Sequence, residues 1–159
     1  MQETINAAKA EFLRAKERMV HSLATTPDDK IDWSPALTAR TPVQQVAHAA
    51  MGTAGIQGLL TNKPFPYTDI AEFDASMRLA EKAFTTREQA LGLLEKTSAE
   101  YLAWLDTVTP EQLASTVQLP FGPSFPMAFG ITFPADHMRA HCAQIAYIQT
   151  ICGDLDWHM

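Results

Sequence analysis

The stretch from Phe125 to Gly153 carries apolar residues and two histidines at the spacing of a single helical face. Residues on this face recur every three or four positions, as they do along one side of an α-helix. They are Phe129, Phe133, His137, His141, Ile145, Ile148 and Cys152. The pattern predicts a long final helix that ends at Gly153, a suitable C-cap residue.

Pro134 falls inside this pattern and allows two interpretations. Either the helix begins there, with Thr132 or Phe133 near its cap, or a longer helix is kinked at the proline. Because Phe125, Phe129 and Phe133 keep phase with the histidines, we favour the kinked helix.

His137 and His141 are four residues apart, so they stand one helical turn from each other. Their Cβ atoms are then about 5–6 Å apart, and the two imidazoles can converge on one small object such as a metal ion. An inward-facing imidazole has to satisfy two ring nitrogens away from water. Binding a cation through one nitrogen and donating a hydrogen bond through the other does so.

A second helix is predicted from Pro42 to about Leu60. Thr41 can cap it, proline fits its first position, and Gln44 completes a capping box. Three glycines fall within seven positions of this helix, at Gly52, Gly55 and Gly58. Each weakens an isolated helix by about 1 kcal/mol relative to alanine. We therefore expect a close approach to a neighbouring element, or room for a ligand.

His48 lies in the second helix among these small residues. A lone histidine there is usually a core residue with satisfied hydrogen bonds, but three imidazoles in one polar cavity are costly unless something binds them. We therefore predict that His48, His137 and His141 are metal ligands. A metal-free alternative stays open, in which glutamine side chains satisfy the imidazole nitrogens; the candidates are Gln44, Gln45 and Gln144.

The rest of the chain also predicts helices. Apolar residues keep helical spacing from Gln2 to Leu23, and a capped pattern runs from Thr85 to about Val108. Shorter helical patterns occur near 75–83 and 111–117, and no run alternates with the period of a strand. The sequence predicts an all-α fold, a bundle of four long helices with long connecting loops, in one domain spanning residues 1–159.

Composition excludes several classes of function. The net charge is −6 and the pI is about 5.2, so nucleic-acid binding is disfavoured. The N-terminus lacks the apolar core of a signal peptide, and no window approaches the ~20 apolar residues of a membrane span. The two cysteines, Cys142 and Cys152, lie about 15 Å apart on one helix and cannot form a disulfide. We expect a cytoplasmic protein that binds no membrane.

With His48 in a helix rich in small residues and an HxxxH pair in the last helix, the chain resembles the DinB/YfiT-like superfamily of metal-dependent enzymes. The resemblance also rests on the Trp33 loop, the T-P-x-Q helix start and the segment from His137 to Asp154. It implies that His48, His137 and His141 bind a divalent ion, Zn or Ni, in an up-down-down-up bundle that is frequently a homodimer. The usual His/Arg-Gly-Gln run after the second histidine of the HxxxH pair is replaced by Cys142-Ala143-Gln144.

The resemblance implies a small-molecule substrate, since characterised relatives include transferases and isomerases that use low-molecular-weight thiols such as bacillithiol or mycothiol. Three neutral imidazoles leave an open coordination position, where water or a thiol would lose its proton near neutral pH. The first hypothesis is thus a metal-dependent hydrolase or thiol-dependent transferase, although no Glu or Asp has the position of a general base. The second is a non-catalytic stress-response or ligand-binding bundle with a structural metal or none. An apolar cavity opening onto the imidazoles, lined by residues such as Met51, Phe129 and Trp33, would favour the enzyme.

His158, in the C-terminal tail, is an alternative fourth ligand. Chain ends are usually mobile, so we expect it to lie outside the site.

Overall fold

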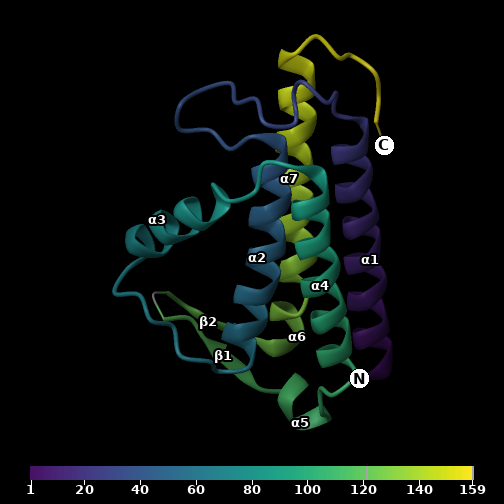
Figure 1. Cartoon of the computed structure of the whole chain (residues 1–159). Coiled ribbons are helices and arrows are strands. Elements are labelled where there is room, and N and C mark those ends of the chain that lie inside the picture. The colour runs from purple at the N-terminus through teal and green to yellow at the C-terminus, as the bar shows by residue number, and fades with distance from the viewer. Residues whose placement is uncertain (121, 159) are drawn as a thin grey trace.

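The computed structural model describes residues 1–120 and 122–158, and its ribbon is mainly helical (Figure 1). In chain order the elements are α1 (Gln2–Thr25), α2 (Pro42–Leu60), α3 (Ile70–Glu81), α4 (Arg87–Leu105), α5 (Pro110–Leu113), β1 (Thr116–Gln118), β2 (Ser124–Pro126), α6 (Met127–Gly130) and α7 (Phe133–Ile151). None of the helices in these two ranges is long and apolar enough to cross a membrane.

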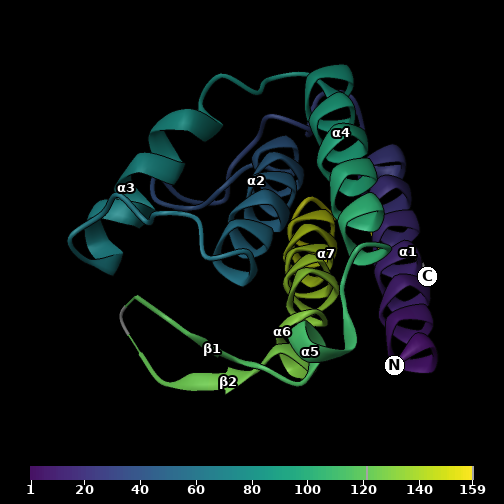
Figure 2. The same ribbon diagram turned by 90° about the horizontal axis from the view of Figure 1, so that it is seen from below.

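The long helices α1, α2, α4 and α7 form the bundle. Helices α1 and α7 run in one direction, and α2 and α4 run in the other (Figure 1). The connection from α2 to α4 returns along the bundle through α3, which is why α4 can run parallel to α2. The order is up-down-down-up, and the predicted all-α four-helix bundle is confirmed. Seen from below, α3 and the β1–β2 hairpin lie on the outer side of α2 and α7 (Figure 2).

Helix α1 buries the face that its sequence predicts. The buried apolar residues are Ile5, Ala8, Phe12, Ala15, Met19 and Leu23. On α4 the core includes Tyr101, whose hydroxyl donates a hydrogen bond to the backbone carbonyl of Ile131. Burial raises the pKa of this hydroxyl, so it stays protonated as a donor.

The capping box predicted at the start of α2 is confirmed. The Thr41 hydroxyl accepts from the Gln44 backbone N–H, and the Gln44 side chain accepts from the Thr41 backbone N–H. The close approach expected of the glycines of α2 occurs at Gly52. A Cβ at Gly52 would lie 2.4 Å from Cε1 of His137, whereas a Cβ at Gly55 would have no atom within 4 Å.

The start of the last helix differs from the prediction of one kinked helix. A short antiparallel strand pair comes first, with Val117 opposite Phe125, so the prediction that the chain has no strand is wrong. The one-turn helix α6 follows, and α7 begins at Phe133 with Thr132 as its N-cap residue. Proline has no N–H to donate, so Pro134 fits the first turn of α7 better than a helix interior. The alternative of a helix that starts near Pro134 is therefore correct.

Helix α3 begins earlier than the 75–83 pattern indicated. Asp69 caps it by accepting a hydrogen bond from the Glu72 backbone N–H. The Glu72 carboxylate in turn accepts from the backbone and hydroxyl of Thr68. These local bonds satisfy donors at the helix start, so the predicted loop is shorter than expected.

Gly130→Ala should lower the free energy of unfolding by about 1–2 kcal/mol, because overpacking strains a filled core. The new Cβ would lie 2.6 Å from Leu60 and 2.6 Å from the Phe125 ring. Gly92→Ala on α4 is the control, since a Cβ there has no atom within 4 Å; it should stabilise the protein by about 0.5–1 kcal/mol. Urea unfolding measures both, and equal effects would contradict the packing described for Gly130.

Candidate metal centre

The three predicted histidines lie together between two adjacent helices. His48 projects from α2, and His137 and His141 project from successive turns of α7. Their ring centroids are 5.0 Å apart for His48–His137, 4.6 Å for His48–His141 and 4.5 Å for His137–His141. One potential ligand atom from each residue lies within 4.8 Å of the other two. The rings can therefore approach a single ion with small adjustments.

Two amide side chains orient His141. Its Nδ1 lies 2.6 Å from Oε1 of Gln45 and 2.7 Å from Oε1 of Gln144. Both partners are oxygen acceptors, so Nδ1 carries the hydrogen and Nε2 carries the lone pair. The lone pair points to the other two histidines, as a metal ligand requires.

A buried carboxylate orients His48 in the same way. Glu81, at the end of α3, is 2 % exposed, and its Oε1 lies 2.6 Å from Nδ1 of His48. Arg40 holds the same carboxylate through Nε at 2.6 Å and Nη2 at 3.1 Å. Burial alone would raise the pKa of Glu81, but the hydrogen bonds from His48 and Arg40 and the charge of Arg40 outweigh it and lower the pKa. The ionised carboxylate thus fixes the Nδ1–H tautomer of His48.

His137 shows how the site would fit a cation. Its Nε2 lies 3.0 Å from Nε2 of His141. Because His141 Nε2 has to accept in this contact, His137 Nε2 has to donate, and the lone pair is then on His137 Nδ1. That atom is buried without a hydrogen-bond partner among the described residues. Such an arrangement is costly in a metal-free protein. Three imidazole nitrogens close together, with the tautomers of two rings fixed by outward hydrogen bonds, fit a divalent metal ion.

Both α7 histidines are held neutral. Burial, followed by the electrostatic effects of the neighbouring His48 and Arg40, lowers the pKa of His137 to about 4. Burial and the two neighbouring histidines lower the pKa of His141 to about 3, against a smaller opposing effect of Gln144. Neutral imidazole is the form that binds metal, so these two side chains would not need to release a proton to do so at neutral pH.

These pKa values predict an acid sensitivity of the metal-free protein. An unfolded histidine has a pKa of about 6.5, so below that pH the unfolded chain binds more protons than the folded one, and stability falls as the pH drops toward 4. At pH 5 the expected loss is about 2 kcal/mol for each of His137 and His141 relative to pH 7.5. Urea unfolding of protein treated with a chelator measures it. His137→Gln should reduce this loss, whereas the same change at the exposed His21 should not; equal pH dependence in both variants would contradict the assignment.

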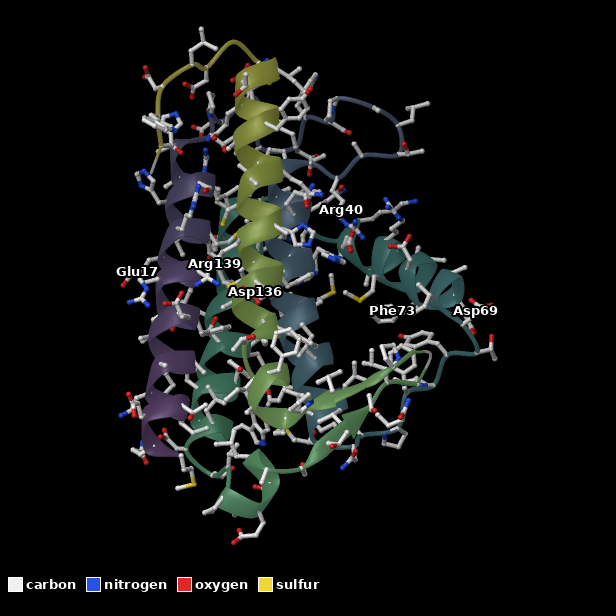
Figure 3. All side chains as sticks on the ribbon, turned by 180° about the vertical axis from the view of Figure 1, so that it is seen from behind. Glu17, Arg40, Asp69, Phe73, Asp136 and Arg139 are labelled. Atoms are coloured by element: carbon white, nitrogen blue, oxygen red, sulfur yellow. The ribbon has the colours of Figure 1, made fainter. Side chains whose placement is uncertain are left out.

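The alternative fourth ligand, His158, lies outside the cluster of three histidines. His158 lies 2.8 Å from the Asp154 carboxylate and beside the His21 ring. Asp136 pairs with Arg139, and both lie on the side of α7 that faces α1 (Figure 3). Gln44 is used in the cap of α2, so only Gln45 and Gln144 of the three candidate glutamines contact an imidazole.

Glu81 and Arg40 are two residues of the site that the sequence did not predict. Glu81 ends a helix whose start was misplaced, and Arg40 lies in a loop directly before the cap of α2. Neither residue belongs to a motif with the histidines. Their proximity results from the return of the chain through α3, which no local pattern encodes.

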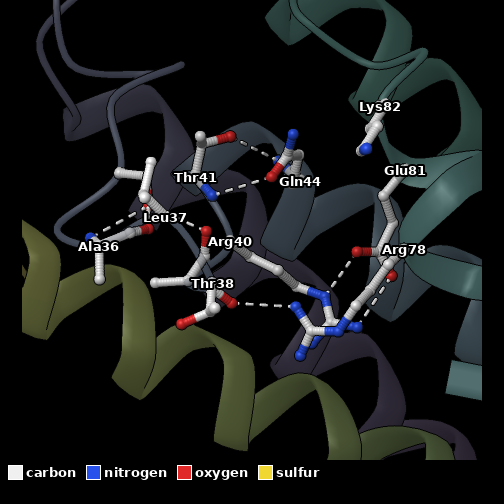
Figure 4. A pocket seen from close by; sticks show the side chains of 11 residues that line it. Ala36, Leu37, Thr38, Arg40, Thr41, Gln44, Arg78, Glu81 and Lys82 are labelled. Atoms are coloured by element: carbon white, nitrogen blue, oxygen red, sulfur yellow. Dashed lines mark hydrogen bonds and ion pairs between the residues drawn. The ribbon is translucent and has the colours of Figure 1, made fainter. Parts of the chain in front are cut away.

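An apolar cavity of about 510 Å³ opens onto His48 and His137. Its walls come from α2, α3, the segment before α3 and the hairpin. Met51, Phe129 and Trp33, the expected lining residues, do not line it, and Phe129 is exposed on α6. A separate cavity of about 910 Å³ with a mixed polar and apolar lining is bordered by Arg40 and Glu81 and by none of the three histidines (Figure 4).

Comparisons with known proteins agree with this architecture. The family model of the DinB superfamily matches residues 11–145. YfiT from Bacillus subtilis, described as a probable metal-dependent hydrolase with an unusual four-helix bundle topology, is 17 % identical over 96 % of this chain and 90 % of that one, with a TM-score of 0.74. A DinB-like protein from Bacillus subtilis is 15 % identical over 92 % of each chain, with a TM-score of 0.64.

A mycothiol-dependent maleylpyruvate isomerase has the same fold. It is 12 % identical over 89 % of this chain, with a TM-score of 0.72, and this chain spans 60 % of its length. No curated protein matches the chain in sequence. Since the family model covers most of the chain, from α1 to α7, the protein belongs to the DinB superfamily.

Proposed function

We propose that the protein is a divalent-metal-dependent enzyme in which His48, His137 and His141 hold one zinc or nickel ion. The observation that carries the proposal is the convergence of three imidazoles beside an apolar cavity. Two structural neighbours, described as a probable metal-dependent hydrolase and a mycothiol-dependent maleylpyruvate isomerase, support it at the level of the fold.

Three histidine ligands leave one position open, and a bound divalent ion would lower the pKa of a water or thiol there and so supply a nucleophile near neutral pH. The protein's own contribution is orientation. Glu81 and the two glutamines fix the ring tautomers of His48 and His141, and the apolar cavity gives a substrate access to His48 and His137.

The position of the acidic residues limits the reaction. No carboxylate is present among the described residues that line the apolar cavity. Glu81 is the carboxylate in contact with the site, and it already accepts from His48 and Arg40. We therefore propose a hydrolysis, or a transfer involving a low-molecular-weight thiol, that proceeds without a carboxylate general base.

The test compares zinc-loaded, chelator-treated and His48→Ala protein in two assays. One assay measures hydrolysis of nitrophenyl esters, and the other measures conjugation of bacillithiol, mycothiol or glutathione to an electrophile. We expect turnover in one assay that falls at least tenfold without zinc and in the variant. Equal rates in all three samples would contradict an enzyme and favour a ligand-binding bundle with a structural metal or none.

A further inference from the structure

The apolar cavity beside the histidines is an elongated groove along α2. His48 and Gly52 line one end, and Gly58 and Lys63 line the other. Ten residues of helix separate His48 from Gly58, which at 1.5 Å per residue is about 15 Å. Lys63 lies over the far end, with its Cδ 3.7 Å from the position of a Cβ on Gly58. A molecule in the groove can therefore reach the imidazoles and Lys63 at the same time.

The walls of the groove are aromatic and aliphatic. The rings of Phe65, Tyr67 and Phe73 form a cluster with centroid distances of 5.1–5.2 Å. Figure 3 shows Phe73 on α3, the helix that stands off the bundle on this side. Leu119 and Pro120 of the hairpin add the opposing apolar surface. Gly55 forms the floor, and no atom lies within 4 Å of the place where its Cβ would be.

Polar groups are few in this groove. Lys63 is the one residue of the Lys, Arg, Asp and Glu types among the described lining residues, and it is exposed. The Tyr67 hydroxyl lies 3.2 Å from the hydroxyl of Ser76 and is thereby engaged. The body of a ligand that occupies the groove would find few hydrogen-bond partners here, so burying hydroxyl groups along it would be unfavourable.

We propose that this groove binds a substrate with an elongated apolar body, an acyl chain or an arylalkyl group, and an anionic end at Lys63. The reactive group of the substrate then lies at the imidazole end. This assignment rests on the proposed function and defines the substrate class of the same site. Apolar burial along the groove supplies affinity, and Lys63 selects the anionic end.

Calorimetric titration with butyrate, octanoate and octanamide tests the proposal, in zinc-loaded and in chelator-treated protein. Octanoate should bind at least tenfold more tightly than butyrate, because the longer chain buries more apolar surface.

Gly55→Leu should fill the floor of the groove and weaken octanoate binding at least tenfold. Gly92→Leu, on the exposed face of α4, should leave it unchanged. Equal affinity for the two chain lengths, or no effect of Gly55→Leu, would overturn the proposal; Gly55→Ala is the milder variant if leucine prevents folding.

Lys63→Met separates the two ends of the groove. It should bring the affinity for octanoate down to that for octanamide and leave octanamide binding unchanged. An octanoate preference that survives in this variant would place the anion at the metal centre and overturn the assignment of Lys63.

The zinc content of the same samples distinguishes the two proposals. Zinc retained without octanoate binding would contradict the groove assignment alone. Octanoate binding that is lost in Gly55→Leu, in a protein that binds no zinc through its histidines, would contradict the metal-dependent enzyme alone.

Discussion

Gly52→Ala should lower the affinity for zinc by at least tenfold while the bundle stays folded. The new Cβ would lie 2.4 Å from Cε1 and 2.7 Å from Nδ1 of His137, far inside van der Waals contact. The helix backbone cannot move away easily, because α2 packs against both α4 and α7. The His137 ring would therefore be displaced from the centre, and a misplaced ligand weakens metal binding.

Gly55→Ala is the matched control, one turn further along the same helix. No atom lies within 4 Å of a Cβ there, so it should leave zinc affinity unchanged. Competition titrations with a chromophoric chelator measure both variants. Equal zinc affinities would show that His137 takes no part in metal binding.

Glu81→Gln should lower zinc affinity by about 10–100-fold and destabilise the protein by about 3 kcal/mol. The neutral amide cannot balance the charge of Arg40, whose side chain is 13 % exposed. The amide oxygen of the variant can accept a hydrogen bond from either His48 or Arg40. The amide NH₂ group then faces the N–H group of the other residue, and two donors cannot form a hydrogen bond. The orientation of the His48 ring and the buried ion pair are weakened together.

Asp74→Asn provides the comparison for this second variant. Asp74 is the other carboxylate that contacts Arg40, at 3.4 Å, and its side chain is 48 % exposed. Surface ion pairs contribute less than about 1 kcal/mol, so this variant should unfold close to the parent and bind zinc equally well. Urea unfolding and the chelator competition distinguish the two, and parallel losses in both variants would mean that Glu81 has no special role at His48.

The histidine positions could be predicted from the sequence because each lies in a regular helix. A spacing of four residues places His137 and His141 on neighbouring turns whatever the tertiary fold is. The cap at Thr41 fixed the phase of α2, and hence the face that carries His48. The glycines of α2 predicted a close approach of this helix to a neighbouring element, and in the structure the His137 ring lies against Gly52.

The surroundings of the site could not be predicted in this way. Glu81 reaches His48 over 33 positions of sequence, through a connection whose path depends on the packing of α3. The hairpin residues that close the groove belong to strands of three residues, too short to show an alternating pattern. Pro134 illustrates a third limit, since a proline in the first turn and one at a kink share the same local periodicity.

Zinc content, measured by elemental analysis, tests the central claim most directly. Protein without an affinity tag is saturated with zinc and desalted, as the parent and as His48→Ala, His137→Ala and the exposed control His21→Ala. We expect about one zinc ion per chain in the parent and in the control, and less than about a tenth of that in the two site variants. Unchanged zinc content in His48→Ala and His137→Ala would contradict the three-histidine centre.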